Sequence, residues 1–71
     1  MGLPSVSGRD VVRALSKAGF VQVSQKGSHV KLRHPDGRVV IVPDHSELKH
    51  GTLRSILRQA RLSVGEFVEL L

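Results

Sequence analysis

A histidine follows a short turn and is surrounded by cations. Residues 26–29 read Lys26-Gly27-Ser28-His29, and Lys31 and Arg33 follow at alternate positions. Histidine suits proton transfer near neutral pH because the ordinary pKa of its imidazole is about 6.5. Lysine and arginine bind phosphate but do not by themselves cut it. A proton-transferring group beside phosphate-binding cations is what RNA cleavage without a metal requires.

This chemistry gives each residue of the segment a role. His29 is the candidate general acid or base, and Lys26, Lys31 and Arg33 are candidate phosphate contacts. Gly27 would let the backbone approach RNA closely, and Ser28 completes the turn as a further candidate RNA contact. Concerted cleavage also needs a second proton-transferring group, for which the sequence leaves His34, His45 or a lysine open.

A metal site is the main alternative use of the histidines. His29, His34, His45 and His50 are separated by 5, 11 and 5 positions, and the chain has no cysteine. Zinc sites usually draw on cysteine, or on closely spaced histidines together with carboxylates. The pattern therefore predicts neither a metal site nor a cofactor, and ordinary solvated histidines are the alternative to a role for His34, His45 and His50.

The charge of the chain points to a polyanionic partner. The 71 residues carry a formal net charge of +5, and every lysine and arginine lies between Arg9 and Arg61. The only aromatic rings are Phe20 and Phe67, whereas platforms that read single strands normally stack bases on such rings. Contact through phosphates is therefore expected. A solvated basic surface that aids solubility is the alternative.

Composition also bounds the class of protein. No apolar run approaches the roughly 20 residues that a membrane-spanning helix needs, and the start of the chain does not resemble a signal peptide. We therefore expect no membrane contact and a cytoplasmic location. The length suits one domain over residues 1–71, with residues 1–6 as a flexible N-terminal segment.

Two longer helices and one short helix are predicted around this segment. Ser7 and Asp10 have the spacing of a capping box, and an apolar stripe follows as far as Gly19. A second helix is expected to open at Gly51 or Thr52. Its charged face carries Arg54, Arg58 and Arg61, interpreted as a contact for RNA or for a protein partner, with a plain solvated face as the alternative. A capping box at Ser63 and Glu66 predicts the short C-terminal helix.

Three strands are predicted between the first two helices. Phe20–Gln25 alternates, with Val21 and Val23 on one side and Gln22 and Ser24 on the other, which predicts a half-buried strand. In His29–His34 the alternation turns Val30 and Leu32 to the core, and His29, Lys31 and Arg33 to the opposite side. Asp36-Gly37 is a strong hairpin signal before the apolar run Arg38–Val42, which Pro43 ends.

The order of these elements predicts an α+β fold. It is α-β-β-β-α with a short C-terminal helix, so two helices would cover one face of a three-stranded antiparallel sheet. Double-stranded-RNA-binding domains (dsRBDs) have the same order.

Several of these motifs, in this order, resemble the HicA family of bacterial toxins. The matching segments run from about Ser7 to Leu71 and are Gly19-Phe20, Lys26-Gly27-Ser28-His29, His34-Pro35-Asp36-Gly37, Val42-Pro43, Glu47-Leu48, Gly51-Thr52-Leu53, residues 53–60 and Leu62-Ser63. Two positions depart from the pattern: Arg61 stands where the family usually has glycine, and Val30 where a second histidine is common.

The resemblance implies a dsRBD-like fold and a small mRNA-cleaving ribonuclease of a toxin–antitoxin system. It implies that His29, in the Gly-Ser-His position, is the catalytic residue, and that a HicB antitoxin masks the active surface. The leading hypothesis is therefore a metal-independent endoribonuclease acting on mRNA. The alternatives are a non-catalytic RNA- or dsRNA-binding module with the same basic surface, and an interaction protein that binds only an acidic partner.

Overall fold

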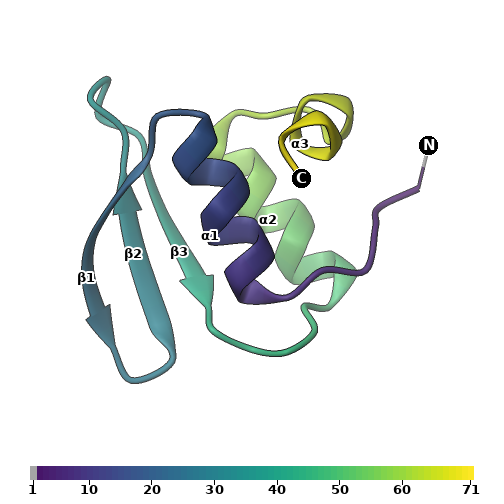
Figure 1. Ribbon diagram of the computed structural model, residues 1–71, viewed down its shortest axis with the longest axis horizontal. Coiled ribbons are helices and arrows are strands. Elements are labelled where there is room, and N and C mark those ends of the chain that lie inside the picture. Colours follow the sequence, from purple (N-terminus) through teal and green to yellow (C-terminus); the bar gives the residue numbers. More distant parts are fainter. Residues whose placement is uncertain (1) are drawn as a thin grey trace.

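The computed structural model describes residues 2–71 and has the predicted order of elements (Figure 1). These elements are α1 (Gly8–Lys17), β1 (Val21–Lys26), β2 (His29–Arg33), β3 (Val39–Pro43), α2 (His50–Ala60) and α3 (Val64–Leu70). The strands form one antiparallel sheet in the order β1-β2-β3. The predicted α+β class and antiparallel meander are therefore confirmed.

Helices α1 and α2 lie on one face of the sheet and leave the other face open (Figure 1). Their apolar stripes and the inward residues of β2 and β3 need a common interior, because neither surface can bury itself alone. The core is almost wholly aliphatic and comprises Val6, Val11, Ala14, Leu15, Phe20, Val30, Leu32, Val40, Val42, Leu48, Leu53, Ile56, Leu57, Ala60 and Phe67. In this arrangement the charged side chains of β2 lie on the open face of the sheet.

Both predicted capping boxes are present. In the first, Ser7 Oγ accepts a hydrogen bond from the Asp10 backbone N–H, and the Asp10 carboxylate accepts one from the Ser7 N–H, both at 3.0 Å. Ser63 and Glu66 make the same pair of bonds at the start of α3. These bonds from Ser7 and Ser63 lower the pKa of Asp10 and of Glu66. Each box satisfies backbone donors that a helix start otherwise leaves unpaired.

Helix α2 begins earlier than predicted. Its first residue is His50 rather than Gly51 or Thr52, and Lys49 occupies the N-cap position without a side-chain hydrogen bond. The preceding backbone explains this start, since the Leu48 N–H donates to the Val6 carbonyl at 2.9 Å. The Lys49 carbonyl then accepts from the Leu53 N–H at 3.0 Å. A tertiary backbone contact therefore decides this boundary.

The N-terminal segment is packed at its inner end. Val6, which we expected within a flexible segment, belongs to the core with 6% of its surface exposed, and Leu3 packs against that core. Met1 lies outside the described residues.

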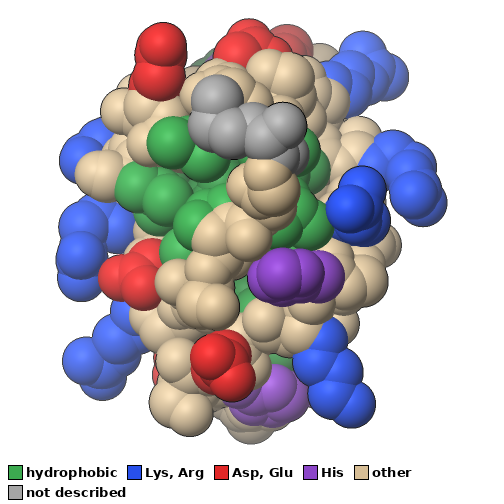
Figure 2. All heavy atoms as spheres, turned by 90° about the vertical axis from the view of Figure 1, so that its right-hand side faces the viewer, with side chains coloured by type: hydrophobic (Ala, Val, Ile, Leu, Met, Phe, Trp, Pro, Cys, Tyr) green, Lys and Arg blue, Asp and Glu red, His purple; other side chains and the backbone are tan. Residues whose placement is uncertain are grey.

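On the side of the molecule that carries α3, apolar side chains gather in the centre and cationic side chains stand at the margins (Figure 2). Among residues 2–71, no helix combines the length and apolar character needed to cross a membrane.

Strand β1 differs most from its prediction. It is exposed along its whole length, with Val21 60% and Val23 48% exposed, so it is not half-buried. Val21 pairs with Arg33 on the open face, and the register shifts between Gln22 and Ser24. The shift is a β-bulge, in which one strand has an extra residue opposite its partner. Because the bulge resets the alternation, Ser24 faces the same side as Val21 and not the side of Gln22.

Candidate active site

The open face of the sheet consists of three rows of side chains that cross the strands. Each row is centred on a polar residue of β2, and the rows are Lys26–His29–Pro43, Ser24–Lys31–Ile41 and Val21–Arg33–Val39. The inward residues Val30 and Leu32 are buried, with at most 5% exposed. The predicted outward orientation of His29, Lys31 and Arg33 follows from this alternation.

The bulge in β1 places Lys26 next to His29. In a regular strand, Lys26 would lie on the face opposite to Val21, that is, on the helix side. With one extra residue inserted, Lys26 pairs directly with His29 on the open face. Directly opposed residues in an antiparallel pair have Cβ atoms about 5 Å apart. A cation and an imidazole therefore project side by side from adjacent strands.

These side chains surround a shallow hollow of about 550 Å³ on the open face. Its lining residues are Ser24, Gln25, Lys26, His29, Lys31 and Ile41. No carboxylate is among them, so the charge in the hollow is positive. The hollow brings together His29, Lys26 and Lys31 of the sequence-predicted site, whereas Arg33 is four residues along β2 and therefore about 13 Å from His29.

The turn that delivers His29 depends on its glycine and on two hydrogen bonds. Gly27 has φ +57°, a left-handed conformation that side chains with a Cβ adopt at a cost. The Gln25 side-chain amide donates to the Gly27 carbonyl at 3.1 Å. On the other side, the Asp44 N–H donates to the Ser28 carbonyl at 2.5 Å. Gly27 and Ser28 therefore shape the turn, and their backbones are tied to β1 and to the segment after β3.

The other histidines lie away from the hollow. His34 follows β2 at its far end, where its ring packs edge-on against Phe20 with centroids 5.1 Å apart. His45 lies against the start of α2, and His50 is the first residue of that helix. Within residues 2–71, no three histidine or carboxylate side chains come close enough together to hold a metal ion. Of the open choices for a second proton-transferring group, only a lysine lines the hollow with His29.

The predicted arginine face of α2 is separate from this hollow. Arg54 and Arg58 border a small depression between α2 and α3, whereas the hollow lies on the opposite face of the sheet. Arg61 follows the helix in the left-handed conformation, with φ +57°. A contact between these arginines and RNA or an antitoxin stays a prediction, and it would require a second surface.

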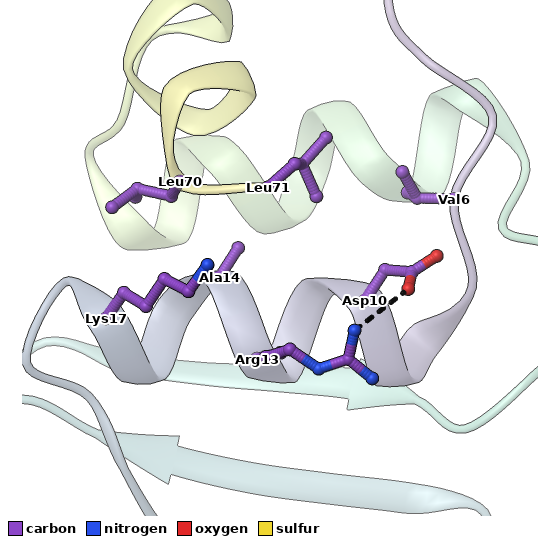
Figure 3. A pocket seen from close by; sticks show the side chains of 7 residues that line it. All are labelled: Val6, Asp10, Arg13, Ala14, Lys17, Leu70 and Leu71. Carbon is purple, nitrogen blue, oxygen red and sulfur yellow. Dashed lines mark ion pairs between the residues drawn. The ribbon is translucent and has the colours of Figure 1, made fainter.

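Another hollow, of about 340 Å³, lies between α1 and α3 (Figure 3). Its apolar side chains include Ala14 and Leu71, and Lys17 stands at its rim. Its one carboxylate, Asp10, is 3.8 Å from Arg13 and already accepts the Ser7 cap bond. The hollow contains no histidine, so it offers no proton-transferring group comparable to His29.

Sequence reasoning missed three residues that line the hollow around His29. Ser24, Gln25 and Ile41 reach it from β1 and β3. Ile41 could have been found by pairing Arg38–Val42 with His29–His34 across the predicted hairpin. Ser24 could not, because its orientation depends on the bulge.

Comparison with models of known protein families gives a match. The family model described as the HicA toxin of bacterial toxin–antitoxin systems matches residues 8–62, which is more than half of the chain. A search of curated proteins finds no match. The matched range includes the residues 26–29 turn and the whole sheet. The HicA family consists of toxins of toxin–antitoxin systems and is known for RNA cleavage, and membership in it implies an antitoxin partner. This chain belongs to the HicA family.

Proposed function

We propose that the protein is a metal-independent endoribonuclease that cleaves mRNA at the hollow around His29. One observation carries this proposal. The hollow combines an exposed imidazole with two lysines and has no carboxylate in its lining. Such a site attracts a phosphodiester, and it lacks the carboxylates through which proteins usually bind Mg²⁺. RNA supplies the nucleophile, because a 2′-hydroxyl lies beside each phosphate.

The reaction needs two proton transfers and stabilisation of charge. His29 removes the proton from the 2′-hydroxyl as the 2′-oxygen forms a bond to phosphorus. The bond from phosphorus to the 5′-oxygen breaks, and Lys26 gives a proton to that leaving oxygen. The products are a 2′,3′-cyclic phosphate and a 5′-hydroxyl, and exchange with water returns both side chains to their starting states. Lys31 stabilises the charge on the non-bridging oxygens.

The sheet register favours Lys26 as the proton donor. Lys26 is directly opposite His29, so the two groups can approach one phosphate from different strands. Lys31 lies two residues along the same strand as His29, roughly 7 Å away at the backbone. His34 and His45 are outside the hollow.

The partners follow from the same surface. A HicB-like antitoxin that covers the open face would deny RNA access to His29. Three exposed aliphatic side chains lie among the cations of that face: Val21, Val39 and Ile41. They give a protein partner apolar area to bury. We propose a cytoplasmic toxin of one domain that needs no small-molecule cofactor.

Cleavage by the purified protein in EDTA tests the proposal. We expect RNA fragments that end in a 2′,3′-cyclic phosphate and a 5′-hydroxyl. His29→Ala should lower the rate by about 10²- to 10⁴-fold, the usual contribution of a general acid or base, with RNA affinity retained. RNA binding without cleavage by the wild-type protein would instead identify a non-catalytic binding module.

A leaving-group substitution tests the role of Lys26. A 5′-thiolate leaves without the help of an acid, so an RNA with sulfur at the bridging 5′ position should restore cleavage to Lys26→Met. The matched variant Lys31→Met removes a cation from the same hollow and should be slow on both substrates. Equal defects of Lys26→Met on the two substrates would restrict Lys26 to phosphate binding.

A further inference from the structure

A second polar groove lies on the other side of β1, between that strand and α1. Its volume is about 350 Å³, and Gln22 and Gln25 of β1 line it together with Arg9 and Arg13 of α1. The mechanism proposed above uses none of its side chains. The lysines of the hollow around His29 contact phosphate, and phosphate contacts carry no direct information on base sequence.

We infer that this groove binds a nucleobase near the scissile phosphate, though not the one adjacent to it, and thereby sets the sequence preference of cleavage. The inference rests on the proposed function, because it takes RNA as the substrate. The groove has the two features that a base requires, an apolar surface for its face and hydrogen-bonding groups for its edge.

The bulge in β1 creates the hydrogen-bonding side of the groove. Gln22 and Gln25 are three residues apart, so in a regular strand they would point to opposite faces. The register shift between Gln22 and Ser24 places both residues on the helix side of β1, where both line the groove. The same shift sends Lys26 to the open face. The extra residue in β1 therefore places Gln22 and Gln25, which can contact a base, on one face of the sheet and Lys26, which can contact phosphate, on the other.

The chemistry of the groove suits a base better than a phosphate. The half-buried Val12 supplies the apolar surface of the groove, and Val30, 5% exposed, contributes only an edge. Each glutamine amide carries both donors and an acceptor, which matches the edge of adenine. Arginine forms two hydrogen bonds with the edge of guanine, and the Asp44 carboxylate in the groove accepts from exocyclic amino groups while repelling phosphate.

The groove and the hollow meet at the edge of the sheet. Gln25 lines both of them, and its amide is bonded to Gly27 in the turn before His29. Strand β1 is an edge strand that pairs only with β2 among the described strands. A nucleotide chain can therefore pass around this edge, with one phosphate at His29 and a base further along the chain beside Gln22.

The arginines of the groove can turn toward a ligand. Arg13 lies 3.8 Å from Asp10, but its side chain is 69% exposed, and exposed ion pairs of this length are weak. Gln22 makes no side-chain hydrogen bond to any of residues 2–71. Gln22 is therefore the residue whose loss should affect base recognition without disturbing the fold.

Mapping of cleavage positions on an RNA pool of mixed sequence tests the groove. Gln22→Ala should reduce the preference at one position near the cut by about 5- to 100-fold, the value of one bidentate base contact, while cleavage of disfavoured sequences continues. Lys17→Ala is the matched control, since it removes a cation from the same helix outside the groove, and it should keep the wild-type preference. An unchanged preference in Gln22→Ala overturns the inference.

A binding measurement separates this inference from the proposed function. We would follow the side-chain amide signals of Gln22 and Gln25 by NMR in His29→Ala while adding short RNAs. A sequence-dependent shift of the Gln22 signal supports the groove even if the wild-type protein fails to cleave. RNA binding that leaves this signal unmoved, or a shift seen only with an antitoxin, overturns the groove as a base site.

Discussion

The two ends of β2 each carry a histidine, and the two histidines are held differently. His29 is exposed at one end, and the side-chain hydrogen bonds and ion pairs of residues 2–71 do not include its imidazole. At the other end, the side chain of His34 is only 21% exposed. Its Nδ1 accepts a hydrogen bond from the Asp36 N–H at 3.2 Å and lies 3.1 Å from the Asp36 carboxylate.

The His34 end ties three parts of the chain together. Arg38 donates from Nε to both Asp36 carboxylate oxygens, at 3.1 and 2.8 Å. Its Nη1 donates to the Ala60 carbonyl at the end of α2, and its guanidinium lies 5.0 Å from the centre of the Phe20 ring. These contacts hold the β2–β3 turn against the segment between α1 and β1 and against the end of α2. Side-chain contacts therefore stabilise the fold at the His34 end of β2, whereas the exposed His29 at the other end is available to a substrate.

The largest predicted difference lies between the two histidines. His29→Ala should lose about 10²- to 10⁴-fold in cleavage rate and leave the thermal midpoint unchanged. His34→Ala should lower the free energy of unfolding by about 1–2 kcal/mol, with normal cleavage by the molecules that stay folded. Cleavage assays and thermal melts of the two variants check this pair. A destabilised His29→Ala would show that the open end of β2 also supports the fold.

Replacing Arg38 should give the next largest effect. Arg38→Met keeps much of the apolar contact with Phe20 but removes the bonds to Asp36 and Ala60. Because the Arg38 side chain is only 18% exposed and its bonds are charge-assisted, we expect a loss of about 2–3 kcal/mol. Urea unfolding measures this loss, with Arg54→Met as the exposed control. Equal stability of the two variants would contradict a locking role for Arg38.

Local signals in the sequence predicted most of the fold. Ser7 with Asp10 and Ser63 with Glu66 mark helix starts because their bonds form within one helical turn. Asp36-Gly37 marks the hairpin because Gly37 adopts φ +100°, which other residues rarely do. The start of α2 was predicted one or two residues late, because it depends on the distant contact between Leu48 and Val6.

The candidate site was predicted only in part, for a similar reason. Alternation along β2 correctly turned His29, Lys31 and Arg33 outward. Nothing in Val21–Lys26 marks the bulge, because a register shift depends on which residues of β2 are opposite. Alternation alone therefore misplaced Ser24, and it could neither set Lys26 beside His29 nor bring Gln22 and Gln25 into one groove.

Gly19 tests how tightly the His34 end is packed. It has φ +98°, and a Cβ at this position would lie 2.9 Å from His34 Nε2. Gly19→Ala should therefore cost about 1–2 kcal/mol from backbone strain alone, and displacement of the His34 ring should add to it. Gly27→Ala is the matched control, since φ there is +57° but a Cβ meets no atom within 4 Å. Chemical denaturation should show the larger loss for Gly19→Ala.

Arg61 offers a gain in stability at the same end of the molecule. It is left-handed after α2, and Arg38 bonds to the carbonyl of the residue before it. Arg61→Gly removes the Cβ that makes this conformation costly, so we expect about 1 kcal/mol of added stability. The thermal midpoint should rise without a change in cleavage rate. A fall in cleavage would show instead that the charge of Arg61 contacts RNA.

Acid should weaken the contacts between Asp36 and Arg38 at the His34 end of β2. Hydrogen bonds from the Arg38 side chain and backbone lower the pKa of Asp36 from 3.8 to about 2. A carboxyl whose pKa falls on folding adds stability above its unfolded pKa, and this stability is lost as the pH falls through the folded value. The difference in thermal midpoint between the wild type and Asp36→Asn should therefore be fully present at about pH 5 and shrink toward pH 2. Asp10 and Glu66 also have lowered pKa values, but they titrate in both proteins and cancel in this difference. A difference that persists unchanged to pH 2 would mean that the carboxylate of Asp36 does not hold Arg38 in place.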